Sequence, residues 1–266
     1  MKRTLRFLQG MVCRTLVLAG LAAAAAMAPS ASVAAGARSV TIGAEDDWPP
    51  YSFRHTDGSL QGITPRLVQA ALKLRGIEAR YEVLPFSRCM RDAMVGRLAA
   101  CFNATITAEN KAPYQWHPTP LFVEELGIFA RKGAGARAAS AQDLEGQIVG
   151  ITRGYTYPSE MVKNPRIRIV EAASDLQLMK LLQAGRLQFA LLNTLPASWR
   201  IQQEASLKGQ IERVGAVSQD GFWLAVSRKH PQGNELVREI EAGLQQLKAS
   251  GEYDRLMQKA RQELIR

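Results

Sequence analysis

A short run near the start of the chain combines the residue types of a ligand-facing loop. Three adjacent carboxylates at 45–47 are followed directly by Trp48 and by the pair Pro49-Pro50, and they close the strand-like stretch 39–43. Carboxylates and prolines are poor material for a hydrophobic core, and binding residues concentrate on loops that rigid elements hold. The run therefore predicts a small-molecule binding loop at the end of a strand.

The sequence lacks the patterns that metal or covalent chemistry needs. His55, His117 and His230 are far apart and do not have the spacing of metal ligands. His117 lies between Trp116 and Pro118 and is interpreted as structural. There is no Gly-x-Ser-x-Gly elbow, phosphate-binding loop or Cys-x-x-Cys pair. We therefore expect a binding protein with no metal and no cofactor rather than an enzyme.

Residues 1–35 are typical of a secretory signal peptide. Lys2, Arg3 and Arg6 make a basic start, an apolar run covers 16–27, and Val33-Ala34-Ala35 is a small-residue cleavage pattern. The apolar run is shorter than the roughly 20 residues that span a bilayer, although an uncleaved membrane anchor is the alternative. We expect a cleaved signal and an exported mature protein.

The charge of the chain does not indicate a nucleic-acid partner. Lys and Arg number 34 against 24 Asp and Glu, which gives a formal net charge of +10. The positive charge is spread along the chain, and no basic cluster is interleaved with aromatic residues. A chain of this length can bury a good core, as one large domain or two small ones.

Two cysteines remain once the predicted signal peptide, with Cys13, is set aside. In an exported chain, Cys89 and Cys101 indicate a single disulfide between the start of a helix and a nearby strand. Two free buried thiols are the alternative.

Strand-length apolar stretches alternate with helical patterns along the chain. One helical pattern begins at Thr64-Pro65, a predicted N-cap followed by proline, and ends at Gly76. Ser87 and Ser174 are predicted to cap two further helices, and 140–143 is typical of a capping box. This alternation predicts parallel βαβ units. The expected strands are 41–44, 80–84, 98–103, 147–152, 167–171, 187–192 and 222–226.

The alternation is interrupted at the small-residue loop 133–139 and restarts after it. Two βαβ sets with a returning C-terminal segment predict an α/β fold of two lobes joined by two strands, near 120–124 and 217–221. Ligands of open α/β sheets bind beyond the carboxyl ends of strands and between domains, so we expect the site in the cleft between the lobes. The expected limits are 36–121 with 220–266 for lobe 1 and 122–219 for lobe 2.

Four segments carry a family resemblance through their order and spacing. They are Glu45 with Trp48-Pro49-Pro50-Tyr51-Ser52-Phe53, Asp57-Gly58 and Gly62-Ile63-Thr64; then 105–110, 143–151 and 248–254. Together they resemble the periplasmic solute-binding proteins of the polar amino-acid ABC transporter type, which are the bacterial extracellular solute-binding proteins of family 3. The resemblance covers residues 39–262 and implies the two-lobed periplasmic binding protein fold of type II.

The resemblance implies roles for residues of lobe 1. Glu45 falls on the acidic position that touches a ligand ammonium, and Trp48 and Phe86 fall on aromatic walls. Asn103 and Thr105 fall on the stretch whose backbone and hydroxyl hold a carboxylate.

The resemblance also implies roles for a lobe 2 loop and for one arginine. Arg153, Tyr155 and Thr156 fall on the loop that closes over the ligand, and we expect this loop to open a helix whose N–H groups suit an anion. The run 85–89 resembles a subgroup with an arginine just after a Pro-aromatic pair, which makes Arg88 a candidate.

Two departures from the family pattern affect ligand recognition. Asn110 stands where the family has a carboxylate-clamping arginine, and an amide cannot replace the charge of a guanidinium. Asn193 stands where the family has the acid that takes the ligand amino group. Either Arg88 and Arg153 supply the positive contacts and Glu45 the negative one, or the ligand is not an ordinary α-amino acid.

The sequence thus predicts a monomeric periplasmic protein that captures a small polar solute, an amino acid or related compound, for a membrane ABC permease. Two alternatives stay open. One is a cleft enzyme of the same fold, a lyase of a prephenate-like acid with Glu45 as its acid or base. The other is a protein that presents its ligand to a separate sensor or chemoreceptor.

Overall fold

The computed structural model describes residues 38–135, 138 and 140–264. The predicted signal peptide, residues 1–35, lies outside the described residues. Within the described ranges, no helix is long and apolar enough to cross a membrane.

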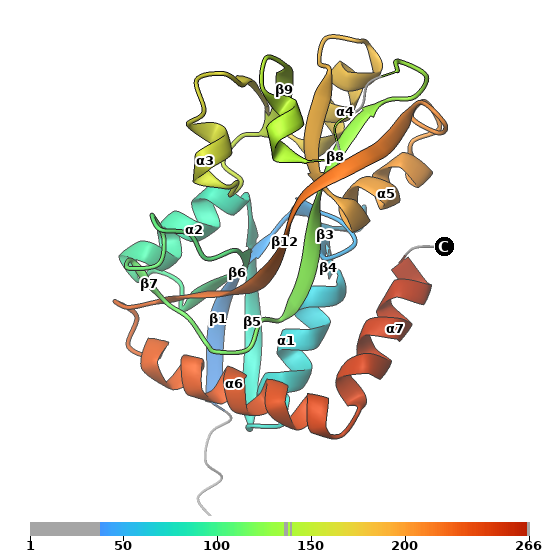
Figure 1. Cartoon of the computed structure of the whole chain (residues 1–266). Coiled ribbons are helices and arrows are strands. Elements are labelled where there is room, and N and C mark those ends of the chain that lie inside the picture. The colour runs from blue at the N-terminus through green and yellow to red at the C-terminus, as the bar shows by residue number, and fades with distance from the viewer. Residues whose placement is uncertain (1–37, 136–137, 139, 265–266) are drawn as a thin grey trace, which may run out of the picture. The chain divides into compact units, whose positions relative to one another are not determined.

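Nine strands form one large mixed sheet (Figure 1), with the strand order β10-β9-β11-β8-β12-β6-β1-β5 and with β7 paired to β12. Pairs β1–β5, β1–β6, β9–β10 and β9–β11 are parallel, whereas β8 and β12 pair antiparallel with their neighbours. The parallel βαβ units of the predicted α/β class are therefore confirmed. The strands are β1 (Arg38–Glu45), β5 (Ile77–Leu84), β6 (Ala100–Ala104), β7 (Tyr114–Gln115), β8 (Phe122–Arg131), β9 (Ile148–Thr152), β10 (Arg168–Ala172), β11 (Phe189–Asn193) and β12 (Ile211–Ser227).

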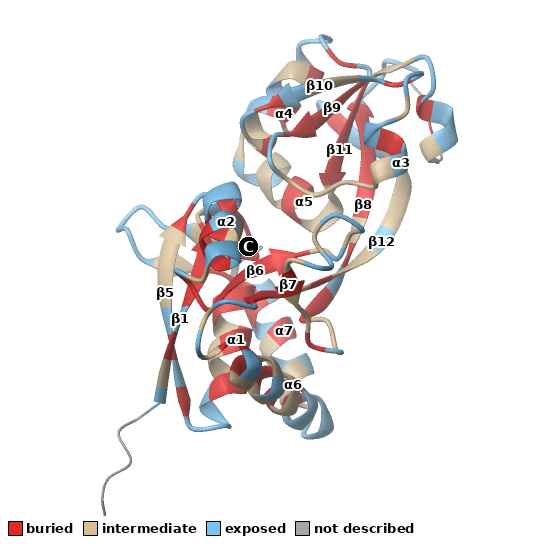
Figure 2. Cartoon of the chain, turned by 90° about the vertical axis from the view of Figure 1, so that its left-hand side faces the viewer, coloured by how far each residue is buried: buried red, intermediate tan, exposed pale blue. Residues whose placement is uncertain are grey.

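Elements β1 to β7 form lobe 1 together with four helices. These are α1 (Ile63–Lys73), α2 (Phe86–Val95), α6 (Gly233–Ala249) and α7 (Glu252–Leu264), and a small sheet of β2 (Asp47–Trp48), β3 (Ser52–Arg54) and β4 (Leu60–Gln61) lies at the end of β1. Helices α1 and α6 pack closely at Gly243. Only glycine permits this approach, because a Cβ at this position would lie 2.2 Å from the Ala71 carbonyl oxygen. Buried residues line the contacts between these helices and the sheet (Figure 2).

Elements β9 to β11 form lobe 2 with α4 (Asp175–Gln183), α5 (Thr194–Gln203) and the four-residue α3 (Ser159–Val162). The predicted capping box is present: Ser140 and Asp143 cap a 3₁₀ turn, Ala141–Leu144. The predicted cap of α4 is also confirmed, because the Ser174 hydroxyl accepts from the Gln177 N–H. Lobe 2 has its own buried clusters, one on each face of its strands.

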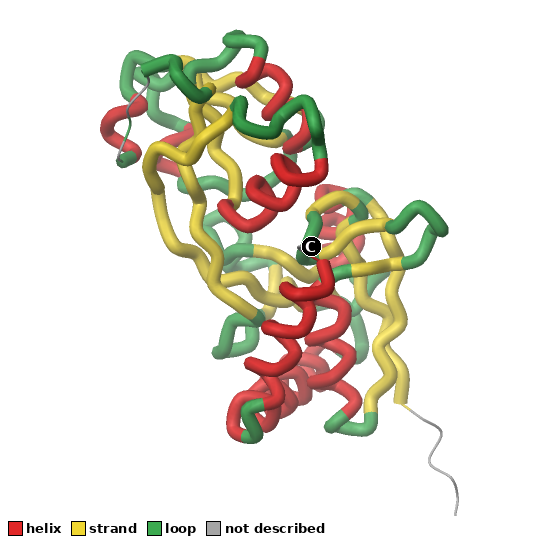
Figure 3. Tube along the Cα trace, turned by 90° about the vertical axis from the view of Figure 1, so that its right-hand side faces the viewer, coloured by secondary structure: helices red, strands yellow, loops and turns green. Residues whose placement is uncertain are grey.

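Strands β8 and β12 run from one lobe to the other as an antiparallel pair (Figure 3), from Phe122 opposite Phe222 to Arg131 opposite Ile211, with two register shifts in β12 between these ends. The prediction gave a strand at 222–226 and a joining strand near 217–221, whereas β12 is one continuous strand over Ile211–Ser227. Its C-terminal part pairs with β6 of lobe 1 and its N-terminal part with β8. This long strand therefore joins the two halves of the sheet.

Two predicted helix caps are wrong. Thr64 lies inside α1, whose first N–H groups are taken by backbone carbonyls: Ile63 donates to Pro50 and Thr64 to Tyr51. The N-cap is Gly62, where φ is 136° and a Cβ would lie 2.1 Å from the Tyr51 oxygen. Ser87 likewise lies within α2, which begins after Pro85.

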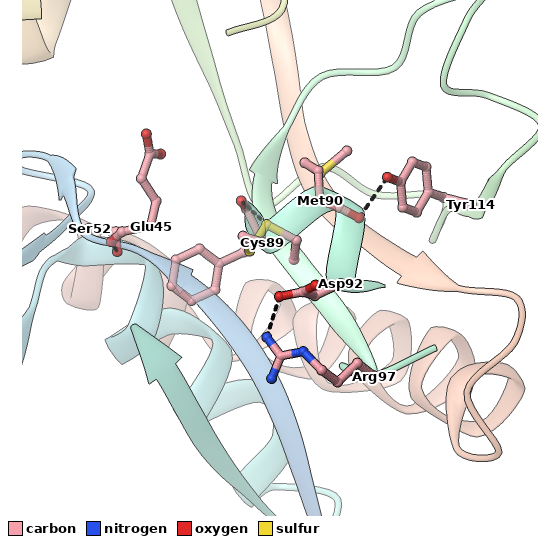
Figure 4. The surroundings of a disulfide bond; sticks show 9 residues. Glu45, Ser52, Cys89, Met90, Asp92, Arg97 and Tyr114 are labelled. Atoms are coloured by element: carbon pink, nitrogen blue, oxygen red, sulfur yellow. Dashed lines mark hydrogen bonds and ion pairs between the residues drawn. A yellow bond between two sulfur atoms is a disulfide. The ribbon is translucent and has the colours of Figure 1, made fainter. Parts of the chain in front are cut away.

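The predicted disulfide is present between Cys89 of α2 and Cys101 of β6, whose Cα atoms are 5.5 Å apart (Figure 4). A Cβ at Gly43 would lie 2.5 Å from the Cys89 Sγ, so glycine lets α2 sit directly on β1. Figure 4 shows the Glu45 side chain pointing away from Cys89. The disulfide therefore fixes α2 beside the end of β1, where the acidic run begins.

Candidate functional site

A pocket lies between lobe 1 and lobe 2, next to the strands that join them. It contains ≈ 440 Å³ of space that atoms do not fill, part of it open to solvent. The lining residues are Glu45, Trp48, Phe86, Asn103, Thr105, Leu126, Tyr155, Thr156, Tyr157, Asn193, Asp220 and Phe222.

Eight of the ten predicted binding residues line this pocket, and Arg88 and Arg153 do not. The eight come from separate parts of the chain. These parts are the ends of β1, β6 and β11, the start of α2, Trp48 of β2 and the loop after β9. The structure thus brings most of the predicted site together, while contact of each residue with a ligand stays a prediction.

Trp48 is part of the core as well as of the pocket wall. It is buried, and its ring centroid lies 4.8 Å from that of Tyr51 and 5.0 Å from that of Phe222. Tyr51 and Ser52 are also fully buried. The interpretation of this run as poor core material is therefore wrong, because its aromatic residues stack into the lobe 1 core. Packing of this kind makes the Trp48 wall rigid.

Glu45 is a buried carboxyl group that lines the pocket. Burial raises its pKa to about 8, and the negative charges of Asp175, Asp47 and Asp46 act in the same direction, while a hydrogen bond with Tyr155 opposes them. The Tyr155 ring in turn meets Phe86 edge-on at 5.8 Å between centroids. A carboxyl group in this position is a strong acceptor for a positively charged or donor group that replaces its lost solvation.

A second buried carboxyl group lies behind the lobe 2 loop. Asp175 accepts a hydrogen bond from the Thr152 hydroxyl, and burial raises the Asp175 pKa to about 6. The Thr152 N–H donates to the Tyr157 hydroxyl at 2.8 Å. These contacts hold Tyr157 against the end of β9, which places the loop 153–157 at the pocket.

Asn103 is held in an uncommon backbone conformation at the pocket. Its φ is 62°, and its Oδ1 accepts from the Thr64 hydroxyl at 2.7 Å. The Nδ2 atom of Asn103 and the Nε1 atom of Trp48 are both buried without a hydrogen-bond partner. Buried donors are normally paired, so these two are candidate contacts for a ligand acceptor.

Asn110 does not line the pocket, and its side chain instead forms hydrogen bonds with the backbone of its own loop. Its Nδ2 donates to the Thr105 carbonyl at 2.7 Å and its Oδ1 accepts from the Thr107 N–H at 2.8 Å. The amide at this position therefore shapes the loop that carries Thr105.

Arg88 and Arg153, the predicted substitutes for the family's carboxylate-clamping arginine, do not line the pocket. Arg88 is exposed on α2, and Arg153 is exposed and forms an ion pair with Glu171 at 3.0 Å. A helix follows the loop at Arg153, as predicted, but 153–158 is irregular and the helix is the four-residue α3, which begins only at Ser159. The lining residues Tyr155 and Thr156 therefore precede this helix rather than form its first turn.

Sequence reasoning missed four lining residues. Tyr157 lies two residues beyond the predicted Tyr155, while Leu126, Asp220 and Phe222 belong to β8 and β12. The proposed crossing points near 120–124 and 217–221 could have indicated the last three, since a cleft between two lobes borders the strands that join them.

Several contacts link the two lobes around the pocket. Arg200 of α5 donates to the backbone and carboxylate oxygens of Asp47, and the Lys163 ammonium lies 3.1 Å from a Glu109 carboxylate oxygen. In addition, the rings of Phe53 and Trp199 lie 5.8 Å apart between centroids. The two lobes therefore contact each other at places other than the two joining strands.

A metal site is not found in the described part of the chain, where no group of three or more His, Cys, Asp or Glu could hold an ion. His117 is buried, accepts from the Leu224 N–H at 3.0 Å, and has its pKa lowered to about 4 by burial. This neutral, bonded imidazole agrees with the structural interpretation.

Two α/β lobes, two joining strands and a polar-aromatic pocket between the lobes define the class of two-lobed solute-binding proteins. The model of the bacterial extracellular solute-binding proteins, family 3, matches residues 40–263. The chain belongs to this family, which confirms the resemblance and the expectation of a binding protein rather than an enzyme.

Relatives agree with this assignment. The chain is 27% identical to the L-cystine-binding protein TcyJ of Escherichia coli K12 over 158 residues, 59% of each protein, so the match spans about three fifths of that relative. It is 25% identical to an L-arginine-binding protein of Pseudomonas aeruginosa over 91% of this chain and 95% of that protein. An ancestral arginine-binding protein bound to arginine has the same fold, with a TM-score of 0.72 and 23% identity over 83% of this chain and 97% of the other.

Proposed function

We propose that this protein captures a small polar solute, an amino acid or a related compound, between its lobes and delivers it to a membrane ABC permease. The observation that carries the proposal is the pocket, because its lining comes from lobe 1, from lobe 2 and from both joining strands. A site built in this way is completed only when the lobes close on the solute. The names of the relatives support an amino-acid-like solute.

The proposed lobe limits are residues 36–121 with 220–266 for lobe 1 and residues 122–219 for lobe 2. The buried clusters support this division, since two draw on β1, β5, β6 and the C-terminal helices, and two draw on β8 to β11. The protein acts as a periplasmic monomer after removal of residues 1–35, in line with a family whose members are extracellular.

The binding residues proposed are those predicted residues that line the pocket. The aromatic wall of Trp48, Phe86 and Tyr155 holds the solute body, and Glu45 takes a positively charged or donor group. Asn103, Thr105, Thr156 and Asn193 supply neutral hydrogen-bonding groups. Arg88 and Arg153 have no part in this arrangement.

Solute binding can be tested by a thermal-shift screen followed by calorimetry on the protein purified from the periplasm of an expressing host. A solute that binds only the folded state raises the melting temperature, by an amount equivalent to about 2.7 kcal/mol at one hundred times Kd. Small-angle scattering should then show a more compact particle with the solute than without it. Absence of any shift across amino acids, amines, organic acids, sugars and small peptides would contradict the proposal.

The partner can be tested by affinity capture from detergent-solubilised membranes with and without the solute. We expect solute-dependent capture of an ABC permease. Capture of a chemoreceptor or a sensor kinase in its place would contradict the transport part of the proposal and leave solute binding intact.

A further inference from the structure

The pocket has negative and neutral polar groups but no positively charged one among the described residues that line it. Glu45 at the end of β1 and Asp220 of β12 are its two acidic residues. No lysine or arginine occurs in the described lining set. A solute carboxylate would therefore enter a low-dielectric space without a countercharge, which opposes its binding.

The positions that could supply a countercharge are occupied in other ways. Asn110 is bonded within its own loop, Arg153 pairs with Glu171 at the surface, and Arg88 is exposed on α2. Arg200 is the most buried of the nearby arginines, but its guanidinium is bound to Asp47 outside the lining set. Ion pairing with a solute carboxylate thus has no group available at the described pocket wall.

The aromatic and neutral donor groups of the pocket suit a different solute. Trp48, Phe86, Tyr155 and Phe222 line the same pocket as Glu45, and the face of an aromatic ring attracts a cation. The Asn103 Nδ2 and Trp48 Nε1 atoms are unpaired neutral donors. Neutral donors can bind a hydroxyl or carbonyl oxygen without a countercharge.

We propose that the pocket selects a solute that has a protonated nitrogen and lacks a free carboxylate. In place of the carboxylate, the solute has either an uncharged acceptor group or no polar group. The protonated nitrogen binds between Glu45, Asp220 and the aromatic rings, and an amide, carbonyl or hydroxyl oxygen of the solute accepts from Asn103 and Trp48. This inference rests on the proposed function, because it assigns the chemical class of the solute that the same pocket captures.

The test compares probes that differ only at the carboxyl carbon. One series is L-arginine, L-argininamide and agmatine, a second is L-lysine, L-lysinamide and cadaverine, and a third is L-phenylalanine, L-phenylalaninamide and phenethylamine. We expect, in each series that binds, that the amide or the amine binds at least about tenfold more tightly than the parent amino acid, as measured by calorimetry. A parent amino acid that binds as tightly as its amide and its amine would overturn the inference.

Two variants test the acidic residues, with a matched control. Glu45→Gln and Asp220→Asn should each weaken the best amine or amide by about tenfold or more, since each removes a carboxyl group that can carry the negative charge opposite a bound protonated nitrogen. Asp254→Asn, at an exposed carboxylate of α7, should leave affinity unchanged. Melting curves show whether each variant is folded, and the comparison of probes on the unaltered protein needs no variant at all.

The remaining outcomes separate this inference from the proposed function. Binding of organic acids, sugars or uncharged peptides in the absence of amine or amide binding would overturn the inference and leave solute capture intact. Failure of every probe in the wider panel would contradict both.

Discussion

Two buried glutamates, one in the joining strands and one in the pocket, differ in how many hydrogen bonds the protein supplies to their carboxyl oxygens. Glu124 of β8 uses both carboxylate oxygens: one accepts from the Tyr51 hydroxyl of lobe 1 and the other from the Leu195 N–H of lobe 2 at 2.8 Å. Glu45 is more deeply buried, 3% exposed against 8%, and its side chain has Tyr155 as a hydrogen-bond partner. Burial raises the pKa of both groups.

The difference separates a structural carboxyl group from a functional one. A buried group whose oxygens are all taken by the protein stabilises the fold, and removing it leaves its donors unpaired. A buried group with spare acceptor capacity is destabilising when charged, and a ligand that brings a donor or a cation restores its solvation. Glu124 thus belongs to the joint between the lobes and Glu45 to the site.

The largest effect is expected from removing the structural glutamate. Glu124→Ala leaves the fully buried Tyr51 hydroxyl and the Leu195 N–H without partners, and should lower the free energy of unfolding by roughly 3 kcal/mol. Urea denaturation measures this value. The matched control is Glu212→Ala, at an exposed glutamate of β12, with a change within about 0.5 kcal/mol. Equal, small effects of both substitutions would contradict the structural role assigned to Glu124.

A pH-dependent effect of opposite sign is expected at the pocket glutamate. The folded pKa of Glu45, about 8, is above the value of 4.5 for an unperturbed group. Between these values the folded state binds more protons than the unfolded state, so the stability from Glu45 is full below pH 4.5 and is lost as the pH rises through 8. Without solute, the free energy of unfolding of Glu45→Gln relative to that of the unaltered protein should therefore rise by roughly 2 kcal/mol between pH 4.5 and pH 6, and should rise further up to pH 8.

Melting curves of both proteins from pH 4.5 to pH 9 measure this dependence. The subtraction of the variant isolates Glu45 from Asp175, whose raised pKa acts in the lower part of the same range. A pH-independent difference between the two proteins would mean that Glu45 stays charged when buried, and that the pocket solvates it without a ligand.

The strand-end cluster of the site was predictable from the sequence because it is local. Carboxylates, an aromatic residue and prolines at the end of a buried strand indicate the Glu45–Trp48 region, and family order extends this to Asn103, Thr105 and Tyr155. Asp220 and Phe222 were missed because β12 reaches the pocket through antiparallel pairing with β8 and β6, which lie about one hundred positions earlier in the chain. Such pairing leaves no short-range pattern.

The position of Arg88 depended on the rotational phase of α2. Phe86 and Cys89, three residues apart, share the buried face of this helix, and the disulfide holds that face against β1 and β6. Arg88 therefore projects from another face, into solvent. The helix was predicted with Ser87 as its cap, two residues after the N-cap in the structure, Pro85, and this start does not reveal which face is buried.

An intermediate effect is expected where a partly buried ion pair links the lobes. The Arg200 side chain is only 11% exposed and binds Asp47, so Arg200→Met should weaken closure and lower solute affinity about fivefold, or about 1 kcal/mol. The control is Arg213→Met, which removes an ion pair with Glu125 between adjacent strands β12 and β8. Calorimetry with the solute identified in the screen compares the two, and a similar loss of affinity in the control would show that Arg200 acts through general stability.

The smallest effect is expected at the second ion pair between the lobes. Lys163 and Glu109 are 73% and 55% exposed, and exposed pairs contribute about 0–1 kcal/mol because water and salt screen them. Lys163→Met should therefore change solute affinity by less than about twofold, and the change should vanish at 0.5 M salt. Affinities at low and high salt measure it. A loss as large as that of Arg200→Met would mean that closure depends on charge across the cleft rather than on burial of the groups that meet there.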